Sequence, residues 1–382
     1  MTNELSLYVH FPFCKRKCLY CDFNSYSDRS QLIPVYCQAL LQEAERYPLG
    51  GRLLRTIYFG GGTPSFLPAC LVAHLLGCLK ERFQHSASAG MEITIEINPG
   101  TATRQDLIRL KEAGFNRLSI GLQAAQNHLL ALIGRIHTWE EFRELFGLAR
   151  EAGFANIGLD LIFGLPEQSM GDWRETLARV LELEPEHISA YGLQVEAGTP
   201  LANQVAAGRL RLPDDETVAT MFHAAMDTLR ADGYDHYEIS NYARPGYYSE
   251  HNLGYWTGRD YLGLGAGASS TCQGERWNNL RDPGEYIARI RNGLPVREER
   301  ELLGRAERLT EAVMLGLRLR SGLGLDTLAR DFQIDLMERS GPAIAEMEEE
   351  GLLIIHDGRL ALSDDGVLVS NQVIAAILRN LD

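Results

Sequence analysis

Strand-like segments alternate with amphipathic helical segments over the first 240 or so residues, and this alternation constrains the fold more than any other feature of the sequence. Two helical segments, 103–115 and 138–154, both end in EAGF, where the glycine is expected to end the helix just before a strand. Alternating strands and helices predict a parallel sheet, open or closed into a barrel. The six expected strands are 5–11, 56–61, 92–98, 117–123, 156–164 and 187–195.

These strands carry polar side chains on one face, which is unusual for parallel strands buried on both sides. In segment 92–98 the three isoleucines share one face, while Thr94, Glu96 and Asn98 share the other. A closed eight-stranded barrel would fill its interior with branched apolar side chains. Six strands with a polar inner face therefore predict an α/β protein with an open (β/α)6 barrel, helices outside and a ligand-lined lumen inside.

The pattern changes after residue 240, and we expect three parts. Residues 1–240 would form the barrel, 241–299 a Tyr- and Gly-rich connecting region, and 300–382 a helical, winged-helix-like C-terminal domain. Segment 239–270 reads as loops and turns, whereas Asp357-Gly358 between two apolar runs signals a hairpin. The segment that would read DNA, AEMEEEG, is acidic, so we expect a lid or docking domain instead.

Charge and hydropathy exclude several classes of partner. Among 382 residues, Lys plus Arg is 37 and Asp plus Glu is 51, which gives a net charge of −14. This charge argues against a nucleic-acid backbone or an anionic membrane surface as the main partner. No apolar run reaches the roughly 18 residues of a transmembrane helix, and the start lacks the basic region of a signal peptide. We expect a cytoplasmic protein with no nucleic-acid partner and no transmembrane segment.

Three of the seven cysteines, Cys14, Cys18 and Cys21, crowd into CKRKCLYC directly after the first expected strand. The other four lie among apolar neighbours and read as small buried residues. Three thiolates in eight residues can hold one metal centre and leave it coordinatively open, although iron–sulfur clusters usually have four. A structural zinc site with His10 as the fourth ligand, or no metal at all, are the alternatives.

This Cys-x3-Cys-x2-Cys spacing resembles the signature of the radical S-adenosylmethionine (SAM) superfamily, over at least residues 5–200. The resemblance implies a [4Fe–4S] cluster on the three cysteines, with SAM on the open iron as the source of a 5′-deoxyadenosyl radical. It also implies SAM contacts from the Gly60–Pro64 turn and from polar positions of the porphyrin-related branch. These residues are Tyr8, Gly61, Gly62, Thr63, Glu96, Gln123, Arg135 and Asp160.

The polar positions have a second interpretation. Taken singly, each could be a buried polar side chain of the lumen or a surface charge. Tyr8, Glu96, Gln123 and Asp160 fall on the polar strand faces, whereas Arg135 lies outside any expected strand. A carboxylate suits ribose hydroxyls or an amine, and arginine suits the carboxylate of SAM.

Further motifs, YVHFPFC, GGGTPS, EINP, GLDLIFGLP and SNxV, resemble one branch of the superfamily over nearly the whole chain. That branch holds the oxygen-independent coproporphyrinogen III oxidases (HemN) and their relatives, the HemW haem chaperones. The oxidases have a further Cys where this chain has Phe23, and an N-terminal extension where the first strand here begins near residue 5. Both departures favour the chaperones.

The segment HNLGYW, from His251 to Trp256, matches the HNxxYW motif of the HemW branch, in which the histidine is associated with haem binding. A neutral imidazole is a good axial ligand of haem iron, and aromatic rings stack on a porphyrin. Alternatively, His251 and Asn252 fix a loop by hydrogen bonds and the aromatic residues are core. The neighbouring aromatic residues are Tyr247, Tyr248, Tyr255, Trp256 and Tyr261.

The resemblance implies a haem chaperone that binds haem and a SAM-liganded cluster and transfers haem to acceptor haemoproteins. An electron donor would serve the cluster, SAM and cluster state would gate transfer, and no catalytic residue is assigned. A second hypothesis is oxidative decarboxylation of coproporphyrinogen III. A third is a zinc-stapled interaction protein, which would have no affinity for SAM.

Overall fold

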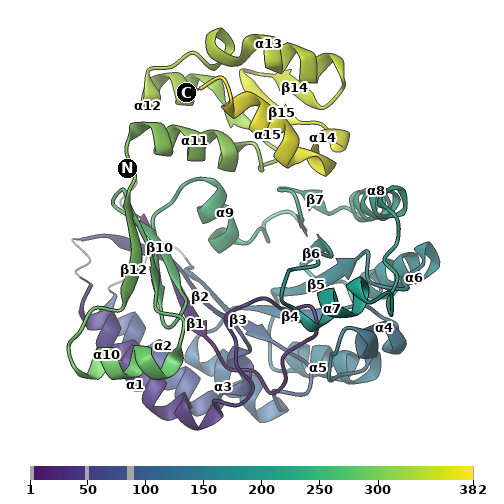
Figure 1. The fold of residues 1–382 in the computed structure, drawn as a ribbon. Coiled ribbons are helices and arrows are strands. Elements are labelled where there is room, and N and C mark those ends of the chain that lie inside the picture. Colours follow the sequence, from purple (N-terminus) through teal and green to yellow (C-terminus); the bar gives the residue numbers. More distant parts are fainter. Residues whose placement is uncertain (1–3, 48–50, 84–89, 382) are drawn as a thin grey trace.

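The computed structural model describes residues 4–47, 51–83 and 90–381, and a twelve-stranded sheet runs through its larger part (Figure 1). Six parallel strands in chain order form the middle of this sheet, and no ladder among the described residues joins its two outermost strands. The predicted open (β/α)6 arrangement is therefore confirmed. The strands are β1 (Glu4–Phe11), β2 (Leu53–Gly61), β3 (Glu92–Ile97), β4 (Arg117–Gln123), β5 (Ile157–Phe163) and β6 (His187–Gly192).

Helices cover the outer face of these strands, while the inner face points toward the C-terminal part of the chain (Figure 1). The apolar side chains of each strand, such as Ile93, Ile95 and Ile97, pack against the helices in one continuous core. The helices that follow β1 to β6 are α1 (Ile33–Glu45), α2 (Ala69–Arg82), α3 (Arg104–Ala113), α4 (Asn127–Leu132), α5 (Trp139–Glu151), α6 (Met170–Leu181), α7 (Pro200–Ala206) and α8 (Asp215–Ala231).

Local sequence signals set the ends of the outer helices. At the start of α3 and α5, Thr103 and Thr138 form capping boxes with the third residue of each helix. At their ends Gly114 and Gly153 have φ angles of 109° and 87°, in the left-handed region that glycine adopts at little cost. The prediction that EAGF ends a helix before a strand is confirmed at both places.

The prediction of loops and turns for segment 239–270 is wrong for half of its residues, which form one helix and, at the sheet edges, two strands and the start of a third. β9 pairs in parallel with β1 and begins an antiparallel extension through β10, β11 and β12, whereas β8 and β7 pair beyond β6. The unpaired backbone groups of β1 and β6 supply the partners that these short strands need. The elements are β7 (Asp235–His236), β8 (Asn241–Ala243), α9 (Glu250–Trp256), β9 (Tyr261–Leu264), β10 (Ser269–Cys272), β11 (Glu275–Asn279), α10 (Pro283–Arg291) and β12 (Arg297–Leu302).

The buried carboxylate of Glu43 on α1 joins the barrel to this extension. It accepts hydrogen bonds from the Gly265 amide at 2.8 Å, the Asn279 amide group at 2.7 Å and the Tyr286 hydroxyl at 2.6 Å. Glu43 is 0% exposed, and burial raises its pKa while these donors oppose the rise. One side chain thus satisfies three polar groups from β11, α10 and the loop after β9.

The C-terminal domain lies across the open side of the barrel, above α9 (Figure 1). Its hairpin turns at Asp357 and Gly358, both with positive φ, as the sequence predicts. Arg318 lies over the ring of Trp256, 5.5 Å from its centroid, and so links this domain to α9. The elements are α11 (Arg305–Gly316), β13 (Leu323–Gly324), α12 (Leu325–Phe332), α13 (Leu336–Glu349), β14 (Leu353–His356), β15 (Arg359–Leu362), α14 (Asp364–Leu368) and α15 (Ser370–Leu378).

Within residues 4–47, 51–83 and 90–381, none of the helices has the length and apolar character needed to cross a membrane.

Replacing Glu43 by alanine should lower the free energy of unfolding by about 3 kcal/mol or more, because three buried donors lose their acceptor. Urea unfolding of the variant and of the unsubstituted protein measures this loss. The matched control is Glu45→Ala at the exposed end of the same helix, which should change stability by no more than about 0.5 kcal/mol. Equal effects of the two substitutions would contradict the role given to Glu43.

Candidate functional site

The three clustered cysteines lie in the loop that leaves the carboxyl end of β1. Cys14 is buried and Cys18 and Cys21 are half-buried, and all three line one cavity of about 410 Å³. Burial raises the pKa of the Cys14 and Cys21 thiols. The amide of Leu19, inside the loop, donates to the Ile133 carbonyl at 3.0 Å, which ties the loop to the segment after α4. Three thiols thus face one space from a loop held at both ends.

His10 is engaged elsewhere and does not complete a zinc site with these cysteines. Its Nε2 lies 2.8 Å from the Asn24 carbonyl oxygen, and its Nδ1 lies 3.0 Å from the Tyr8 hydroxyl. Among the described residues, no three His, Cys, Asp or Glu side chains gather as ligands of a single metal ion. Thiolates that bind separate irons of a cluster need not converge in that way. The zinc alternative has no support in this geometry.

The glycine turn after β2 packs its backbone directly against the cysteine loop. The Gly62 amide donates to the Phe11 carbonyl at 2.8 Å, and the Thr63 amide donates to the Phe13 carbonyl at 2.8 Å. A Cβ atom on Gly62 would lie 2.8 Å from both carbonyl oxygens and 3.0 Å from the Cys14 sulfur. Only glycine therefore fits at this position.

Buried carboxyl groups line the lumen beside this turn. Glu96 accepts hydrogen bonds from the Tyr58 hydroxyl and from the Gly61 amide, each at 3.0 Å. Asp160 accepts a hydrogen bond from the Ser119 hydroxyl at 3.0 Å. Burial, and then the charge of Asp160, raise the pKa of Glu96 to about 8, and burial also raises the pKa of Asp160. Two carboxyl groups with raised pKa values favour a cationic ligand in the space between them.

Arg135 reaches the same cavity from the segment between α4 and α5. Its guanidinium donates to Asn98 Oδ1 at 2.7 Å and lies 3.7 Å from the Cys18 sulfur. Its Nε is buried and has no partner among the described residues. Gln123, at a register shift of β4, has a φ of 76° and also lines the cavity. An arginine beside a cysteine at a cavity wall suits an anionic group of a ligand.

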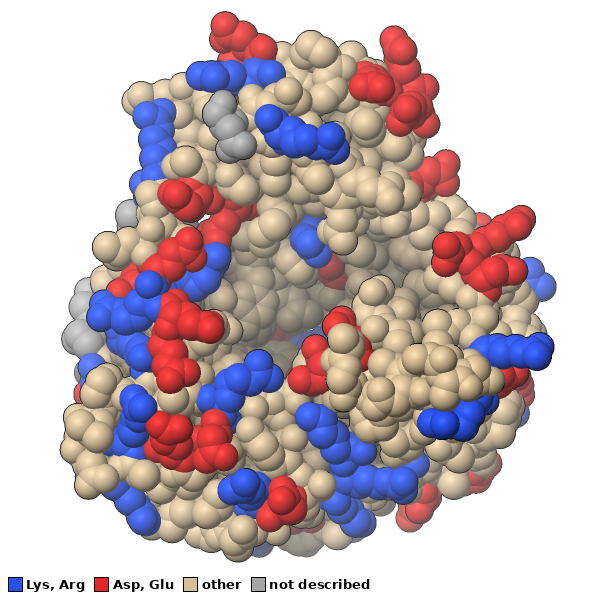
Figure 2. Space-filling model, viewed as in Figure 1, with Lys and Arg blue, Asp and Glu red and all other residues tan. Residues whose placement is uncertain are grey.

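A second cavity, of about 550 Å³, adjoins the first, and the two share Asp22, Phe23, Gly61 and Glu96 on their walls. Tyr8 lines this second cavity, not the one that contains the cysteines. Figure 2 shows the surface hollowed in the middle of this face, below the C-terminal domain, with charged side chains of both signs around the hollow.

The HNLGYW segment forms α9, which the barrel holds by its first turn. The carboxylate of Glu92, at the start of β3, accepts hydrogen bonds from the Glu250 and His251 amides, each at 3.0 Å. The imidazole of His251 lies 1% exposed inside the barrel, with Nδ1 2.7 Å from the Thr56 hydroxyl and Nε2 2.9 Å from the Tyr255 hydroxyl. Burial, and then nearby arginines, lower the pKa of His251 to about 3, so the ring is neutral.

Comparisons with known proteins agree with this geometry. The family model described as "Radical SAM superfamily" matches residues 8–180, and the one described as "HemN C-terminal domain" matches residues 303–369. A relative named "Heme chaperone HemW", from Bacillus subtilis (strain 168), is 37% identical over 98% of this chain and 100% of its own length. This chain belongs to the HemW family.

Two further relatives bear on the branch and the fold. A "Heme chaperone HemW" from Escherichia coli (strain K12) is 40% identical over 69% of each chain. A solved structure titled "Coproporphyrinogen III oxidase (HemN) from Escherichia coli is a Radical SAM enzyme" superposes with a TM-score of 0.85, at 26% identity, over 98% of this chain and 90% of that one. The HemW family and the oxidase thus share one overall fold.

In this HemW-family chain the cavity of 410 Å³ brings together most of the residues that the sequence singles out. Tyr8 and His251 lie outside it, on or behind the wall of the second cavity. Four further residues of the polar strand faces also line the first cavity, although the motifs assign them no role and only the period-two pattern of the strands could have indicated them: Tyr58, Asn98, Arg117 and Ser119. The expected residues that meet there are Cys14, Cys18, Cys21, Gly61, Gly62, Thr63, Glu96, Gln123, Arg135 and Asp160.

Gly62→Ala should destabilise the protein by about 1–3 kcal/mol, because the added methyl group collides with two backbone carbonyl groups that cannot move independently. Urea midpoints measured without added cofactors give the loss. Gly77→Ala on α2 is the control, since nothing lies within 4 Å of its Cβ and alanine favours a helix. A Gly62→Ala midpoint at or above that of the unsubstituted protein would refute the close contact.

The stability of the ligand-free protein should fall between about pH 5 and pH 8, in part through Glu96. A folded-state pKa of about 8, above the ordinary 4.5, means that the folded form binds the proton more tightly. The stabilisation from this proton is complete below the pKa of Glu96 in the unfolded chain, and it is lost as pH rises through the pKa of Glu96 in the folded protein. The glutamine of Glu96→Gln cannot ionise. The urea midpoint of this variant should therefore rise relative to that of the unsubstituted protein as pH increases. A difference independent of pH would contradict the raised pKa.

Proposed function

We propose that this protein binds haem and passes it to acceptor haemoproteins, and that it carries a [4Fe–4S] cluster and SAM. The observation that carries the proposal is the position of His251 on α9. Its neutral imidazole stands behind Tyr255, a wall residue of the cavity that adjoins the cysteine cavity. The names of the relatives, which are heme chaperones, support the same function.

The cysteine cavity fits the two cofactors that the superfamily implies. Cys14, Cys18 and Cys21 supply three thiolates on one wall, which suits a cluster with one open iron. When bound, SAM completes the coordination of that iron, and an electron from the cluster cleaves it in superfamily members. The absence of a side chain at Gly62 keeps the turn close enough to Cys14 for backbone groups to approach a ligand.

The acidic and basic side chains of the cavity would bind different groups of a SAM molecule. Glu96 and Asp160 would favour its cationic amine and sulfonium or accept from its ribose hydroxyls, because both carboxyl groups are buried where a positive charge lowers their pKa. Arg135 would pair with its carboxylate near Cys18. Gln123 adds an amide with both donor and acceptor groups.

His251 would serve as an axial ligand of haem iron through Nε2. Thr56 bonds Nδ1 and so fixes the ring orientation, in the way that outer partners orient metal-binding histidines. Nε2 is covered by the Tyr255 hydroxyl, which lies 2.9 Å away. Haem binding would therefore displace the Tyr255 hydroxyl from this nitrogen.

Coproporphyrinogen decarboxylation is the second candidate, because the fold superposes on that of the oxidase. Phe23, where the oxidases have a further cysteine, speaks against it. The Phe23 side chain is 62% exposed and lies on the wall shared by the two cavities. A chaperone instead needs an acceptor haemoprotein and, if the cluster state gates transfer, an electron donor.

The proposal is tested by titrating haem into anaerobically reconstituted protein and following the Soret absorbance. Saturable binding near one haem per chain is expected, with His251→Ala about tenfold weaker or worse, since an axial ligand is lost. Tyr255→Phe keeps the ring and removes the competing hydroxyl. It should bind haem about 2- to 10-fold more tightly, because a hydrogen bond of about 0.5–1.5 kcal/mol need not be broken.

His128→Ala, at an exposed position of α4, is the matched control and should bind like the unsubstituted protein. A coproporphyrinogen assay with SAM and a reductant runs on the same samples. Decarboxylation without specific haem uptake would overturn the chaperone assignment in favour of the oxidase. Haem uptake unaffected by His251→Ala would refute the ligand assignment alone.

A further inference from the structure

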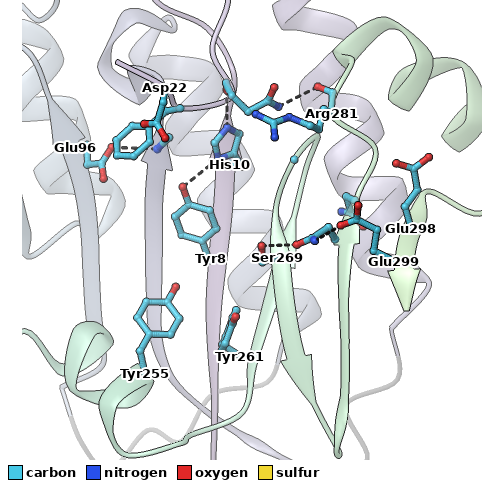
Figure 3. Close-up of a pocket in the computed structure, with 16 residues that line it drawn as sticks. Tyr8, His10, Asp22, Glu96, Tyr255, Tyr261, Ser269, Arg281, Glu298 and Glu299 are labelled. Carbon is cyan, nitrogen blue, oxygen red and sulfur yellow. Dashed lines mark hydrogen bonds between the residues drawn. The ribbon is translucent and has the colours of Figure 1, made fainter. Parts of the chain in front are cut away.

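The cavity of about 550 Å³ is lined by aromatic rings along one side and by a single cationic side chain (Figure 3). In this view Tyr255 and Tyr261 lie at one end and Arg281 at the other, with Tyr8 and His10 between them. The volume lies within the roughly 300–1,000 Å³ range of small-molecule and cofactor sites. A planar apolar ligand with one anionic edge fits such a distribution of side chains.

The guanidinium of Arg281 is uncompensated. It has no hydrogen-bond or ion-pair partner within the part of the chain that the structure describes, and no other Lys or Arg is among the described residues that line this cavity. Its backbone, in contrast, is fixed, because the Arg281 carbonyl accepts a hydrogen bond from Asn24 Nδ2 at 2.9 Å. Asn24 lies three residues after Cys21, so the cysteine loop sets the position of Arg281.

Acidic residues confine where a carboxylate can bind. Glu298 and Glu299 lie at one edge of the cavity, and Glu299 already accepts a hydrogen bond from Asn278 Nδ2 at 2.7 Å (Figure 3). Asp22 and Glu96 line the wall that this cavity shares with the cysteine cavity. Carboxyl groups therefore lie on two sides of the cavity, and where ionised they repel a ligand carboxylate. The side chain of Arg281 points toward His10, and this is the place in the cavity that favours a ligand carboxylate (Figure 3).

The opposite end of the cavity leads to the imidazole of His251. The Tyr255 hydroxyl, on the cavity wall, lies 2.9 Å from His251 Nε2, and the ring of Tyr58 stacks on the imidazole with centroids 4.9 Å apart. Tyr255 lines this cavity, whereas the stacked ring of Tyr58 lines the cavity that contains the cysteines. An iron atom that replaces the Tyr255 hydroxyl would thus approach His251 from the Tyr255 side, which is the side of this cavity.

We propose that the 550 Å³ cavity is the haem chamber, with the porphyrin against Tyr8 and Tyr261 and a propionate carboxylate paired with Arg281. The inference rests on the proposed function and adds the place and the anionic anchor of the cargo. Because the chamber shares Gly61 and Glu96 with the cysteine cavity, haem would lie beside the SAM site.

The test compares two ligands, iron protoporphyrin IX and its dimethyl ester, on the reconstituted full-length protein in the same detergent concentration. The unsubstituted protein should bind the free acid about 10- to 100-fold more tightly than the ester, as expected for a charge-assisted hydrogen bond. Arg281→Gln should weaken acid binding by the same factor and leave ester binding unchanged. Arg281→Lys should recover part of the loss, since it keeps the charge without the planar fork.

Arg291→Gln, at an exposed position on α10 outside the cavity lining, is the matched control and should behave like the unsubstituted protein. Far-ultraviolet circular dichroism and iron content of each variant report folding and cluster loading. Equal affinity of Arg281→Gln and unsubstituted protein for the free acid would overturn the chamber assignment while haem binding itself stands. If the unsubstituted protein takes up neither ligand, the chamber and the proposed function fall together.

Discussion

The geometry of the candidate haem-binding segment depends on one buried carboxylate, that of Glu92. It accepts two amide hydrogen bonds from the first turn of α9, where the amides of a helix have no partner within the helix. Burial raises the pKa of Glu92, and the charge of Arg117 and the two amides oppose the rise. With α9 anchored there, His251 reaches Thr56 and Tyr255 forms a cavity wall. Glu92 thus places the first turn of the helix, and the hydrogen bond with Thr56 orients the imidazole.

The lumen of this barrel is lined by polar and ionisable side chains and not by packed apolar ones. Its polar strand faces bring Arg117, Glu96 and Asp160 into one enclosed space in which water cannot easily compensate charge. Such groups are costly unless each finds a partner or a ligand. The outer strand faces and the helices supply the continuous apolar core that stabilises this arrangement. The inner strand faces can therefore carry polar side chains, because the outer strand faces are packed against the helices.

The cysteine loop contributes to both cavities. Cys14, Cys18 and Cys21 line one cavity, Asn24 lines the other, and Asp22 and Phe23 line both. The Asn24 carbonyl oxygen lies 2.8 Å from His10 Nε2 of the barrel. The Asn24 side-chain amide donates a hydrogen bond to the carbonyl of Ala266, which follows β9, at 3.0 Å. A change in this loop would therefore reach both cavities, which gives the proposed gating of haem transfer a physical route.

The sequence by itself determined the strands with their polar faces, the glycine-ended helices and the hairpin at Asp357-Gly358, because each is encoded in a short stretch of the chain. The alternation of strands and helices then predicted parallel pairing. It also placed the three cysteines at the end of β1. Only the tertiary structure decided that 239–270 extends the sheet, that Glu92 holds α9, and that two adjoining cavities exist. Glu92 and His251 are 159 residues apart and Thr56 and His251 are 195 apart, and periodicity carries no information about which distant segments meet.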